Sequence, residues 1–417
     1  MSLNAPHKKI SAREAAYLAV LASLQEEKFV NESLEAWLRL SLPKEADFRL
    51  AQEIAYGTIR MALSLDFYAR ELTDSGKLSL KLKEKALLRT ALYQQVFMSR
   101  VPLFAITDES VKIAKKTCHP RFTSFLNMLL RKSAVKPFET PQGNSIEALS
   151  IRFSYPKFFI ERLFDKFTVE EVLKILEHGN KPSSVTLRLR PECEREFYEN
   201  SAFEFMHRDP YFLLLKDTTQ LTSLIQRKDC YVQNPTPALL LWSLSKDIDK
   251  HTPLKILDLC ASPGGKLLAA HDLFPKSILY ANDVSDSKIK KVHENCLKYD
   301  IQAHLSVQNG EEFKTAEKFD IVIVDAPCSN TGVLNKRAEA RWRLNPVNLK
   351  EQVNLQKKLI LKALELLTPL GEVWYMTCSL LSEENQEISG IFKNCTKETF
   401  ILPSGVNDGG YAVSIKP

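Results

Sequence analysis

The sequence predicts an α/β fold with a doubly wound parallel sheet, preceded by an all-α region and a small α+β adaptor. Three observations lead to this fold class. Apolar residues recur at helical spacing through the first third of the chain, residues 147–230 mix helical and strand patterns, and strands alternate with helices after that. At 417 residues the chain has room for two or three domains with separate cores. We therefore expect domains at residues 1–140, 147–230 and 231–417.

The first region is predicted to be a helical bundle. Ser11 and Glu14 have the spacing of a capping box at a helix N-terminus, and an apolar repeat at helical spacing follows them. A second apolar stripe runs from Leu88 to Val96. Prolines and a glycine in KPFETPQGNS (residues 136–145) then predict a linker. The adaptor after it combines helical patterns with the strand-like SVTLRLR.

Four short apolar runs in the last region predict buried parallel strands. Helical segments lie between them: one covers residues 286–299, and a longer one carries an apolar face that includes Leu355, Leu359 and Leu367 before TPLG ends it. Ligands bind such sheets at the carboxyl ends of the strands, where the motifs described below all fall. The predicted strands are residues 254–259, 278–281, 319–324 and 372–376.

Positive charge is concentrated in the N-terminal third. Residues 1–145 contain 22 Lys and Arg against 15 Asp and Glu, whereas the rest of the chain contains 35 against 36. The basic residues gather in two groups: Lys77, Lys81, Lys83, Lys85 and Arg89, then Lys112, Lys115, Lys116 and Arg121. Such an excess is typical of a surface that contacts phosphates, and a solvated helix face is the plainer alternative.

Composition argues against several classes of protein. No apolar stretch reaches the roughly 18 to 20 residues of a membrane span, and the start, MSLNAPHKKISAREA, lacks the apolar core of a secretory signal. The eight cysteines include no C-x-x-C pair, which argues against zinc ligation and against a disulfide framework. We expect a cytoplasmic monomer without a metal, whose cysteines are mostly free thiols.

A glycine-rich turn follows the first predicted strand of the last region, in LKILDLCASPGGK. Gly264 and Gly265 allow a tight turn and the close approach of a ligand, before a helix whose first amides point at it. The turn is not a phosphate-binding P-loop, because Leu267 stands where Ser or Thr is required. Asp283 follows the next strand and could accept two ribose hydroxyls, with helix capping as the alternative. Together these features fit S-adenosylmethionine as readily as a dinucleotide.

Two cysteines, Cys328 in VIVDAPCSNTGVL and Cys378 in VWYMTCSLLSEEN, each follow a strand-like run. A thiolate adds readily to an electron-poor pyrimidine, and a second thiol can act on the adduct. Addition to carbon 6 of cytosine makes carbon 5 nucleophilic enough to accept a methyl group from a sulfonium. We expect one cysteine to be the nucleophile and the other to promote release, with Asp325 stabilising the protonated ring nitrogen. Taken singly, each cysteine is better explained as core filler.

With these motifs the chain resembles the RNA cytosine-C5 methyltransferases. The resemblance is carried by CASPGGK (260–266), the acidic residue of YANDVS, DAPCS (325–329) and TCS (377–379), of which the last two at this spacing are highly specific. The N-terminal region, with AITDESVKIAKK and FLNMLLRK, resembles the RNA-binding domain related to the antitermination factor NusB that these enzymes carry. The resemblance implies a NusB-like domain followed by a Rossmann-like class I methyltransferase domain.

The resemblance also implies roles for individual residues. Cys378 would be the nucleophile that adds to carbon 6, and Cys328 would assist elimination and product release. Asp325 would lie near both the sulfonium and the target base. S-adenosylmethionine would be bound by Asp325, Asp283 and Asn309, and by a loop that consists of Cys260, Ala261, Ser262, Pro263, Gly264, Gly265 and Lys266. The implied substrate is a cytosine in small-subunit (16S) ribosomal RNA.

The chain departs from the family pattern mainly in segments expected to face the RNA. Arg190 stands where an asparagine is common, Asn309 where an acidic residue is common, and DGGY (408–411) replaces a DGFF-like turn. The target base must leave its stack, so RNA contacts have to offset a cost on the order of a few kcal/mol. We expect these contacts from the basic bundle and from the segment Arg341, Trp342 and Arg343, with packing as the alternative for the tryptophan.

Three alternatives follow from the same residues. The same chemistry on transfer RNA would keep the mechanism and change the N-terminal contacts. A non-catalytic NusB-like RNA-binding factor for ribosome assembly or antitermination would not need two thiols. A methyltransferase of exocyclic amino groups would carry an Asn/Asp-Pro-Pro-aromatic motif, which DAPC is not. The pair of cysteines therefore favours methylation at carbon 5.

Overall fold

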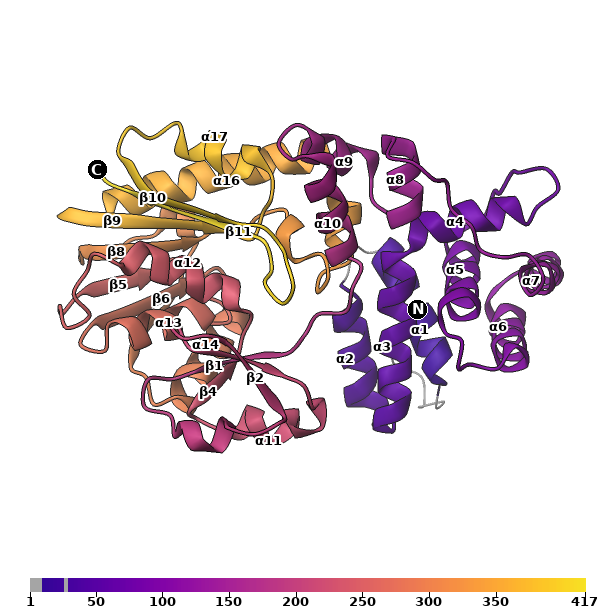
Figure 1. The fold of residues 1–417 in the computed structure, drawn as a ribbon, viewed down its shortest axis with the longest axis horizontal. Helices are drawn as coiled ribbons and strands as arrows, with labels where there is room; N and C mark the ends of the chain where they lie inside the picture. The colour runs from indigo at the N-terminus through magenta and orange to yellow at the C-terminus, as the bar shows by residue number, and fades with distance from the viewer. Residues whose placement is uncertain (1–9, 26–28) are drawn as a thin grey trace. The chain divides into compact units, whose positions relative to one another are not determined.

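The computed structural model describes residues 10–25 and 29–417. The first nine residues lie outside the described residues, and with them most of the segment inspected for a secretory signal and the start of the predicted first domain. The chain divides into two compact units, Met1–Glu161 and Arg162–Pro417, which are described separately (Figure 1). Within the described ranges, no helix is both long enough and apolar enough to span a bilayer.

The described part of the first unit is built from helices. They are α1 (Ala12–Gln25), α2 (Val30–Ser41), α3 (Glu45–Arg60), α4 (Ala62–Glu71), α5 (Leu82–Phe97), α6 (Leu103–Thr117), α7 (Pro120–Ser133) and α8 (Ile146–Phe153). The Ser11 hydroxyl accepts a hydrogen bond from the Glu14 amide at 3.2 Å and caps α1, as predicted. Helix α5 is buried from Ala86 to Gln94 and contacts α1, α3, α4, α6 and α7. The predicted all-α fold is confirmed, with α5 at its centre (Figure 1).

The helical unit encloses an ion pair that contains Arg89, a residue that the sequence placed among the candidate phosphate contacts. Arg89 is 7% exposed, and its guanidinium donates two hydrogen bonds to the carboxylate of Asp66, at 2.8 and 2.6 Å. The Lys85 ammonium lies 3.1 Å from the same carboxylate. Burial alone would raise the pKa of Asp66, but Arg89 and Lys85 outweigh it and lower that pKa. The inclusion of Arg89 among the phosphate contacts was wrong, because its side chain is committed to the core.

The second unit begins with a small α+β part, as predicted. Helix α9 (Lys157–Phe164) crosses the boundary between the units. The strands that follow form an antiparallel sheet in the order β2-β3-β1-β4, and β1 contains the core of the predicted strand SVTLRLR. Its elements are α10 (Val169–His178), β1 (Thr186–Leu189), β2 (Phe203–His207), β3 (Phe212–Leu215), α11 (Leu221–Gln226) and β4 (Cys230–Val232).

A seven-stranded sheet in the order β10-β11-β9-β8-β5-β6-β7 forms the rest of this unit. The five strands from β9 to β7 run parallel, β11 runs antiparallel to β9, and β10 runs antiparallel to β11. The elements are α12 (Pro235–Ser245), β5 (Lys255–Asp258), α13 (Gly265–Leu273), β6 (Ile278–Asp283), α14 (Asp286–Lys298), β7 (Ala303–Val307), β8 (Phe319–Asp325), α15 (Ala340–Arg343), α16 (Pro346–Glu365), β9 (Leu367–Thr377), α17 (Gln386–Ser389), β10 (Cys395–Ile401) and β11 (Gly410–Ile415).

Helices cover both faces of this sheet, which confirms the doubly wound fold. Apolar side chains of α12, α13 and α14 pack on one face and those of α16 and α17 on the other (Figure 1). The strand order reverses between β5 and β8, and a ligand crevice opens at such a reversal in sheets of this kind. The glycine turn follows β5 and the DAPCS segment lies at the end of β8. The fold therefore brings both motifs to the place where a ligand is expected.

The sequence prediction was wrong at one edge of the sheet. Leu367, assigned to a helix, is the first residue of β9, since α16 ends at Glu365 and Leu367 pairs with Phe319 of β8. The strands β10 and β11 were not predicted, and they make the sheet mixed rather than purely parallel. β10 is only partly buried along its length, so it lacks the continuous apolar run that marks a buried strand.

Arg190, one of the departures from the family pattern, has a packing role. The side chains of Arg188 and Arg190 both bind the carboxylate of Asp272 on α13, at 2.6 and 3.3 Å. Arg190 also donates to the carbonyl of Tyr299 at 3.1 Å, and Arg188 stacks over the ring of Tyr231 at 4.3 Å. These contacts join the small antiparallel sheet to the larger one. The expectation that Arg190 faces the RNA was wrong, because its guanidinium is used within the unit.

We expect Asp66→Ala to destabilise the protein by about 3–5 kcal/mol, because it leaves the guanidinium of Arg89 buried without its counter-ion. Equilibrium urea unfolding followed by circular dichroism measures the loss. The matched control is Asp108→Ala, which removes an exposed partner of Lys112 and should change stability by roughly 0.5 kcal/mol or less. Equal, small effects of the two substitutions would contradict a structural role for the buried pair.

Candidate active site

The sequence-predicted site residues meet at the carboxyl ends of β5, β6, β8 and β9. Three contacts connect them: Ser262 with Asp283, Lys266 with Asp325, and Cys328 with Cys378. Cys378 also acts electrostatically on Lys266, so the glycine turn and the thiol pair share one electrostatic environment. In the described ranges, no cluster of three or more His, Cys, Asp or Glu side chains is arranged to hold a metal ion.

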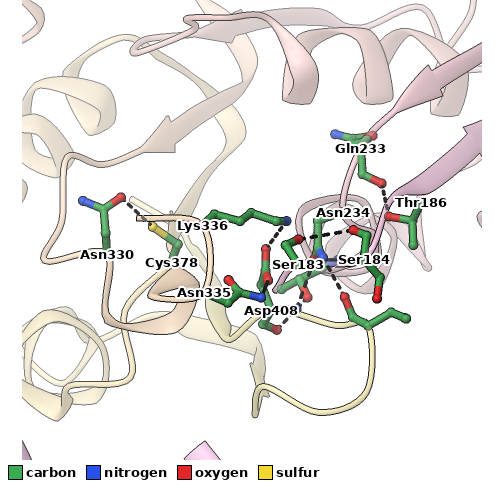
Figure 2. A network of polar contacts seen from close by, with 12 residues as sticks. Ser183, Ser184, Thr186, Gln233, Asn234, Asn330, Asn335, Lys336, Cys378 and Asp408 are labelled. Carbon is green, nitrogen blue, oxygen red and sulfur yellow. Dashed lines mark hydrogen bonds and ion pairs between the residues drawn. The ribbon is translucent and has the colours of Figure 1, made fainter. Parts of the chain in front are cut away.

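The two cysteines form a thiol pair. The sulfur of Cys328 lies 3.2 Å from that of Cys378, although fifty positions of sequence separate them. Cys328 is buried, whereas Cys378 is half-buried and its sulfur lies 3.4 Å from the side-chain oxygen of Asn330 (Figure 2). The hydrogen bond to Cys378, together with burial, raises the pKa of Cys328 well above its ordinary value. Cys328 therefore keeps its proton more readily than an ordinary cysteine, and Cys378 is the more exposed sulfur of the pair.

The glycine turn is built around a backbone that only glycine adopts readily. Gly264 has a φ of +105° and directly precedes α13, so the chain reverses there before the helix begins. Asp283 accepts hydrogen bonds from the amide of Ser262 at 3.0 Å and from that of Val284 at 2.7 Å. Lys288 lies 3.1 Å from the same carboxylate. Asp283 thus connects the turn to the end of β6, and the two amides fix the position of its carboxylate beside the loop.

A small cluster of buried charges lies beneath the turn. Lys266 forms an ion pair with Asp325, and both are more than half buried. Burial lowers the pKa of Lys266, but the charges of Asp325 and Asp258 and the hydrogen bond to Asp325 outweigh it and raise that pKa. Asp258 is completely buried, and no described residue gives its carboxylate a well-aligned hydrogen bond. Burial and the charge of Asp325, opposed by Lys266, raise the pKa of Asp258 to about 7.

The C-terminal DGGY segment supports the cysteine loops. The amide of Gly332 donates to the carbonyl of Cys378 at 2.8 Å, and the amide of Gly409 donates to the carbonyl of Gly332 at 2.8 Å. A Cβ on Gly332 would lie 2.5 Å from the Gly409 oxygen, so no larger residue fits there. At Gly410 a Cβ would lie 2.9 Å from Thr236. The expectation that this departure from the family pattern faces the RNA was wrong, because these glycines are buried against the catalytic loops.

Asp408 anchors the same segment. Its carboxylate accepts from the ammonium of Lys336 at 2.6 Å and from the amide of Asn335 at 3.3 Å, as Figure 2 shows. Its backbone amide donates to the side chain of Asn234 at 3.2 Å, and its carbonyl accepts from Thr236 at 2.7 Å. Asp408 therefore joins the start of α12 through its backbone and the loop after Cys328 through its buried carboxylate, just before β11 begins.

Two sequence-predicted residues have other contacts than expected. Asn309 follows β7, where its side-chain oxygen accepts from the amide of Glu311 at 3.2 Å and caps a short helical turn. Arg341 is 0% exposed and donates to the side chain of Asn180 at 2.9 Å and to the carbonyl of Gly179 at 3.1 Å. The prediction that Arg341 contacts phosphates was wrong, because its guanidinium is enclosed by the protein.

The sequence analysis missed several residues that shape the site. Asn330 contacts the Cys378 sulfur, Asp258 lies under Lys266, and Glu384 and Asn385 bind the cysteine loops. Asn330 and Asp258 stand within two positions of residues that were singled out, so proximity to the motifs was the available signal. Glu384 and Asn385 lie in a segment without a strong periodic pattern, and only the fold brings their side chains to the thiols.

We expect Asp258→Asn to stabilise the ligand-free protein at pH 8 and to have little effect at pH 4. The folded-state pKa of about 7 exceeds the ordinary value of 3.8, so the contribution of Asp258 to stability is fully present below pH 3.8 and is lost as the pH rises through 7. The asparagine cannot ionise, and the difference should reach on the order of 2–4 kcal/mol. Urea unfolding followed by tryptophan fluorescence at both pH values measures it; parallel pH profiles would exclude a buried, titrating Asp258.

Comparison with known proteins gives two family matches. The family described as 16S rRNA methyltransferase RsmB/F matches residues 247–409, and the NusB family matches residues 10–135. The probable ribosomal RNA small subunit methyltransferase B of Bacillus subtilis (strain 168) is 26% identical over 402 residues, covering 92% of this chain and 88% of the relative. Ribosomal RNA small subunit methyltransferase B of Photorhabdus laumondii is 27% identical over 401 residues, covering 88% of each chain.

A solved structure supports the fold over almost the whole length. The crystal structure of PH0851 aligns with a TM-score of 0.76 and 22% identity, covering 98% of this chain and 100% of the other. At 22% identity, this similarity supports the fold alone. The family matches cover helices α1 to α7 and six of the seven strands of the large sheet, including β8 and β9, which precede the two cysteines. Residues 247–409 are therefore similar to the 16S rRNA methyltransferase RsmB/F family and residues 10–135 to the NusB family, joined in one chain.

Proposed function

We propose that the protein transfers the methyl group of S-adenosylmethionine to carbon 5 of a cytosine in small-subunit ribosomal RNA, through a transient bond between Cys378 and carbon 6. The observation that carries this proposal is the 3.2 Å contact between a buried thiol and a more exposed one, at the strand reversal where a ligand is expected. A methyltransferase whose substrate atom is a nitrogen or an oxygen needs no such pair, because that atom is nucleophilic enough to accept the methyl group directly.

Attack by the Cys378 sulfur forms a bond to carbon 6 and moves electron density toward carbon 5. The carboxyl group of Asp325 hydrogen-bonds to the protonated ring nitrogen and stabilises the charge that develops there. After carbon 5 has accepted the methyl group, a water molecule takes the carbon 5 proton and the electron pair of that bond restores the double bond between carbons 5 and 6. The bond between sulfur and carbon 6 breaks, and its electron pair leaves with the sulfur of Cys378. Cys328, which keeps its proton at neutral pH, supplies a proton donor next to the departing sulfur and so promotes release.

The cofactor supplies an electrophilic methyl group on a sulfonium. The turn Cys260–Lys266 would hold it through backbone groups freed by the tight bend at Gly264, and Asp283 would accept its ribose hydroxyls. The carboxylate of Asp283 receives amide hydrogen bonds that fix its direction, and carboxylate oxygens accept more than one donor each. Asn309 remains a candidate for the adenine, since its amide group is exposed.

We propose a division of labour along the chain, with residues 1–140 contacting RNA, residues 147–230 connecting, and residues 231–417 catalysing the reaction in the cytoplasm. Several basic side chains of the first region are used internally: Lys112 pairs with Asp108, and Lys116 with Glu14. Within the two basic groups that the sequence analysis names, four exposed cations have no carboxylate within ion-pair distance among the described residues. These four candidates for phosphate contacts are Lys77, Lys81, Lys115 and Arg121.

Replacement of the two cysteines should block different steps of the reaction. Cys378→Ala should give neither product nor adduct, because the attacking sulfur is gone. Cys328→Ala should methylate the cytosine and then stall, so that a protein–RNA adduct survives denaturation. Incubation of naked small-subunit ribosomal RNA with labelled methyl donor, followed by denaturing gel electrophoresis, measures both outcomes.

The control for this experiment is Cys296→Ala, which replaces a buried thiol that packs in the core of the sheet. It should form product and no persistent adduct. Wild-type turnover by both Cys328→Ala and Cys378→Ala would overturn the mechanism. Turnover on transfer RNA but not on ribosomal RNA would keep the chemistry and replace the substrate.

Loss of phosphate contacts should appear in the salt dependence of binding. The double variant Lys115→Gln/Arg121→Gln should bind ribosomal RNA more weakly and lower the slope of log K against log salt by about 1.5, because each contact contributes roughly 0.7 to 0.9. Filter binding at several salt concentrations measures the slope. The control Lys174→Gln/Lys358→Gln removes two exposed lysines that are paired with Glu170 and Glu311 and should leave the slope unchanged. Equal slopes for both double variants would contradict the assigned surface.

A further inference from the structure

We propose that Glu384 and Asn385 are positioning residues, which together hold the two catalytic thiols in contact. Neither residue touches a sulfur atom. Each one binds the backbone or the side chains of the residues that flank a cysteine, and both belong to the segment SEEN that follows the TCS motif. This inference rests on the proposed function, and it adds a mechanism by which two loops on neighbouring strands keep their sulfurs 3.2 Å apart.

Asn385 holds Cys378 from both sides. Its side-chain oxygen accepts from the hydroxyl of Thr377 at 2.6 Å, and its side-chain nitrogen donates to the carbonyl of Ser379 at 2.9 Å. Thr377 and Ser379 directly precede and follow the cysteine. The amide of Ser379 also donates to the Thr377 hydroxyl at 3.2 Å, which closes a small ring of hydrogen bonds. Asn385 is 0% exposed, so no water competes for these contacts.

Glu384 holds Cys328 in the same manner. One carboxylate oxygen accepts from the amide of Ser329 at 2.9 Å, and the other accepts from the hydroxyl of Ser329 at 2.5 Å. Gln356 of α16 donates to Glu384 at 3.0 Å and to the carbonyl of Pro327 at 2.9 Å. The residue after Cys328 is therefore bound by Glu384 directly, and the residue before it is bound through Gln356.

Glu384 and Asn385 act together, because they are adjacent in the chain and one backbone contact fixes the position of both. The carbonyl of Glu384 accepts from the hydroxyl of Tyr375 at 2.6 Å, and Tyr375 lies on β9 three positions before Cys378. Hydroxyl contacts of 3.1 to 3.2 Å among Ser329, Thr331 and Ser379 further join the two cysteine loops. Burying a carboxyl group costs free energy unless the group is hydrogen-bonded. The partners of the Glu384 carboxylate are Ser329, which follows Cys328, and Gln356, which binds the residue before Cys328.

A positioning role for Glu384 differs from an acid–base role in its response to glutamine. A glutamine side chain keeps the acceptor for the Ser329 amide and can donate to the Ser329 hydroxyl, so Glu384→Gln should retain turnover within about threefold. Glu384→Ala leaves the Ser329 amide unpaired and frees the loop. A displacement of roughly 1 Å can cost about a hundredfold in rate, so release should slow and the adduct should accumulate.

Asn385 should affect the other step. In Asn385→Asp the group that donates to the Ser379 carbonyl becomes an acceptor, so the Cys378 loop loses its register and adduct formation should slow by tenfold or more. Single-turnover kinetics with labelled methyl donor separate adduct formation from release. The control Glu387→Gln changes an exposed carboxylate two positions after Asn385 and should alter neither rate.

A second readout reports the sulfur contact without RNA. Oxidised glutathione should convert the thiols of Cys328 and Cys378 to a disulfide, with two glutathione thiols released, and the sulfurs need approach by only about 1 Å to reach bonding distance. Mass spectrometry measures the rate of this exchange. We expect wild type, Glu384→Gln and Glu387→Gln to react alike, and Glu384→Ala and Asn385→Asp to react at least tenfold more slowly.

Unchanged exchange rates in Glu384→Ala and Asn385→Asp would overturn the positioning role, as would an equal slowing of adduct formation and release in both. A wild-type protein that forms the disulfide quickly but does not methylate the RNA would refute the proposed function and leave the positioning role standing. If Glu384→Ala does not fold, the exchange rate of Asn385→Asp and the turnover of Glu384→Gln still decide the matter: a hundredfold loss of turnover in the glutamine variant would contradict positioning.

Discussion

The contact between two sulfurs on separate loops is the constraint on which the rest of the catalytic unit depends. Cys328 and Cys378 follow the neighbouring parallel strands β8 and β9, so the sheet alone brings their loops to one edge. A sheet does not set the distance between loops to within an ångström, and the surrounding contacts do this. The backbone of Gly332 binds the carbonyl of Cys378, and that of Gly409 binds Gly332. Residues that are far apart in the chain thereby fix the distance between the two sulfur atoms.

Burial is the main reason for the unusual acid beneath the glycine turn. Asp258 is completely enclosed, and burial together with the charge of Asp325 raises its pKa although the ammonium of Lys266 opposes the change. If all three groups were ionised, Asp258, Asp325 and Lys266 would leave one net negative charge in a region with little solvent. A protonated Asp258 removes that charge, so the interior of the sheet sets the state of a group next to the glycine turn.

Much of this fold could be predicted from sequence, because its strongest signals are local. The strands around LKILDL and FDIVIV are continuous apolar runs, and the helix at residues 286–298 follows a clear repeat. The loops after these strands could be grouped because parallel strands end at one edge. β10 could not be predicted, since it is half-exposed, and Glu384 could not be recognised, since its partners are Ser329 and Gln356 at distant positions. Polar contacts between residues that are distant in the sequence produce no periodic pattern from which they could be predicted.

The errors about RNA contacts have a common physical cause, which is the use of arginine inside the protein. Arg89, Arg190 and Arg341 were each assigned to a surface, and each one binds a carboxylate, a side-chain amide or backbone carbonyls within its own unit. A planar guanidinium with several donors suits such enclosed contacts, whereas the ammonium of lysine is more strongly hydrated and stays at the surface. Arginines are nevertheless found on the surface of the helical unit as well. The exposed cations without a described carboxylate partner there are Arg39, Lys44, Arg70, Lys77, Lys81, Arg100, Lys115, Arg121 and Arg131. For a basic helical region of this kind, the cations that stay exposed and unpaired estimate the phosphate-binding surface better than the total of positive charges, because the total includes guanidiniums that are used inside the protein.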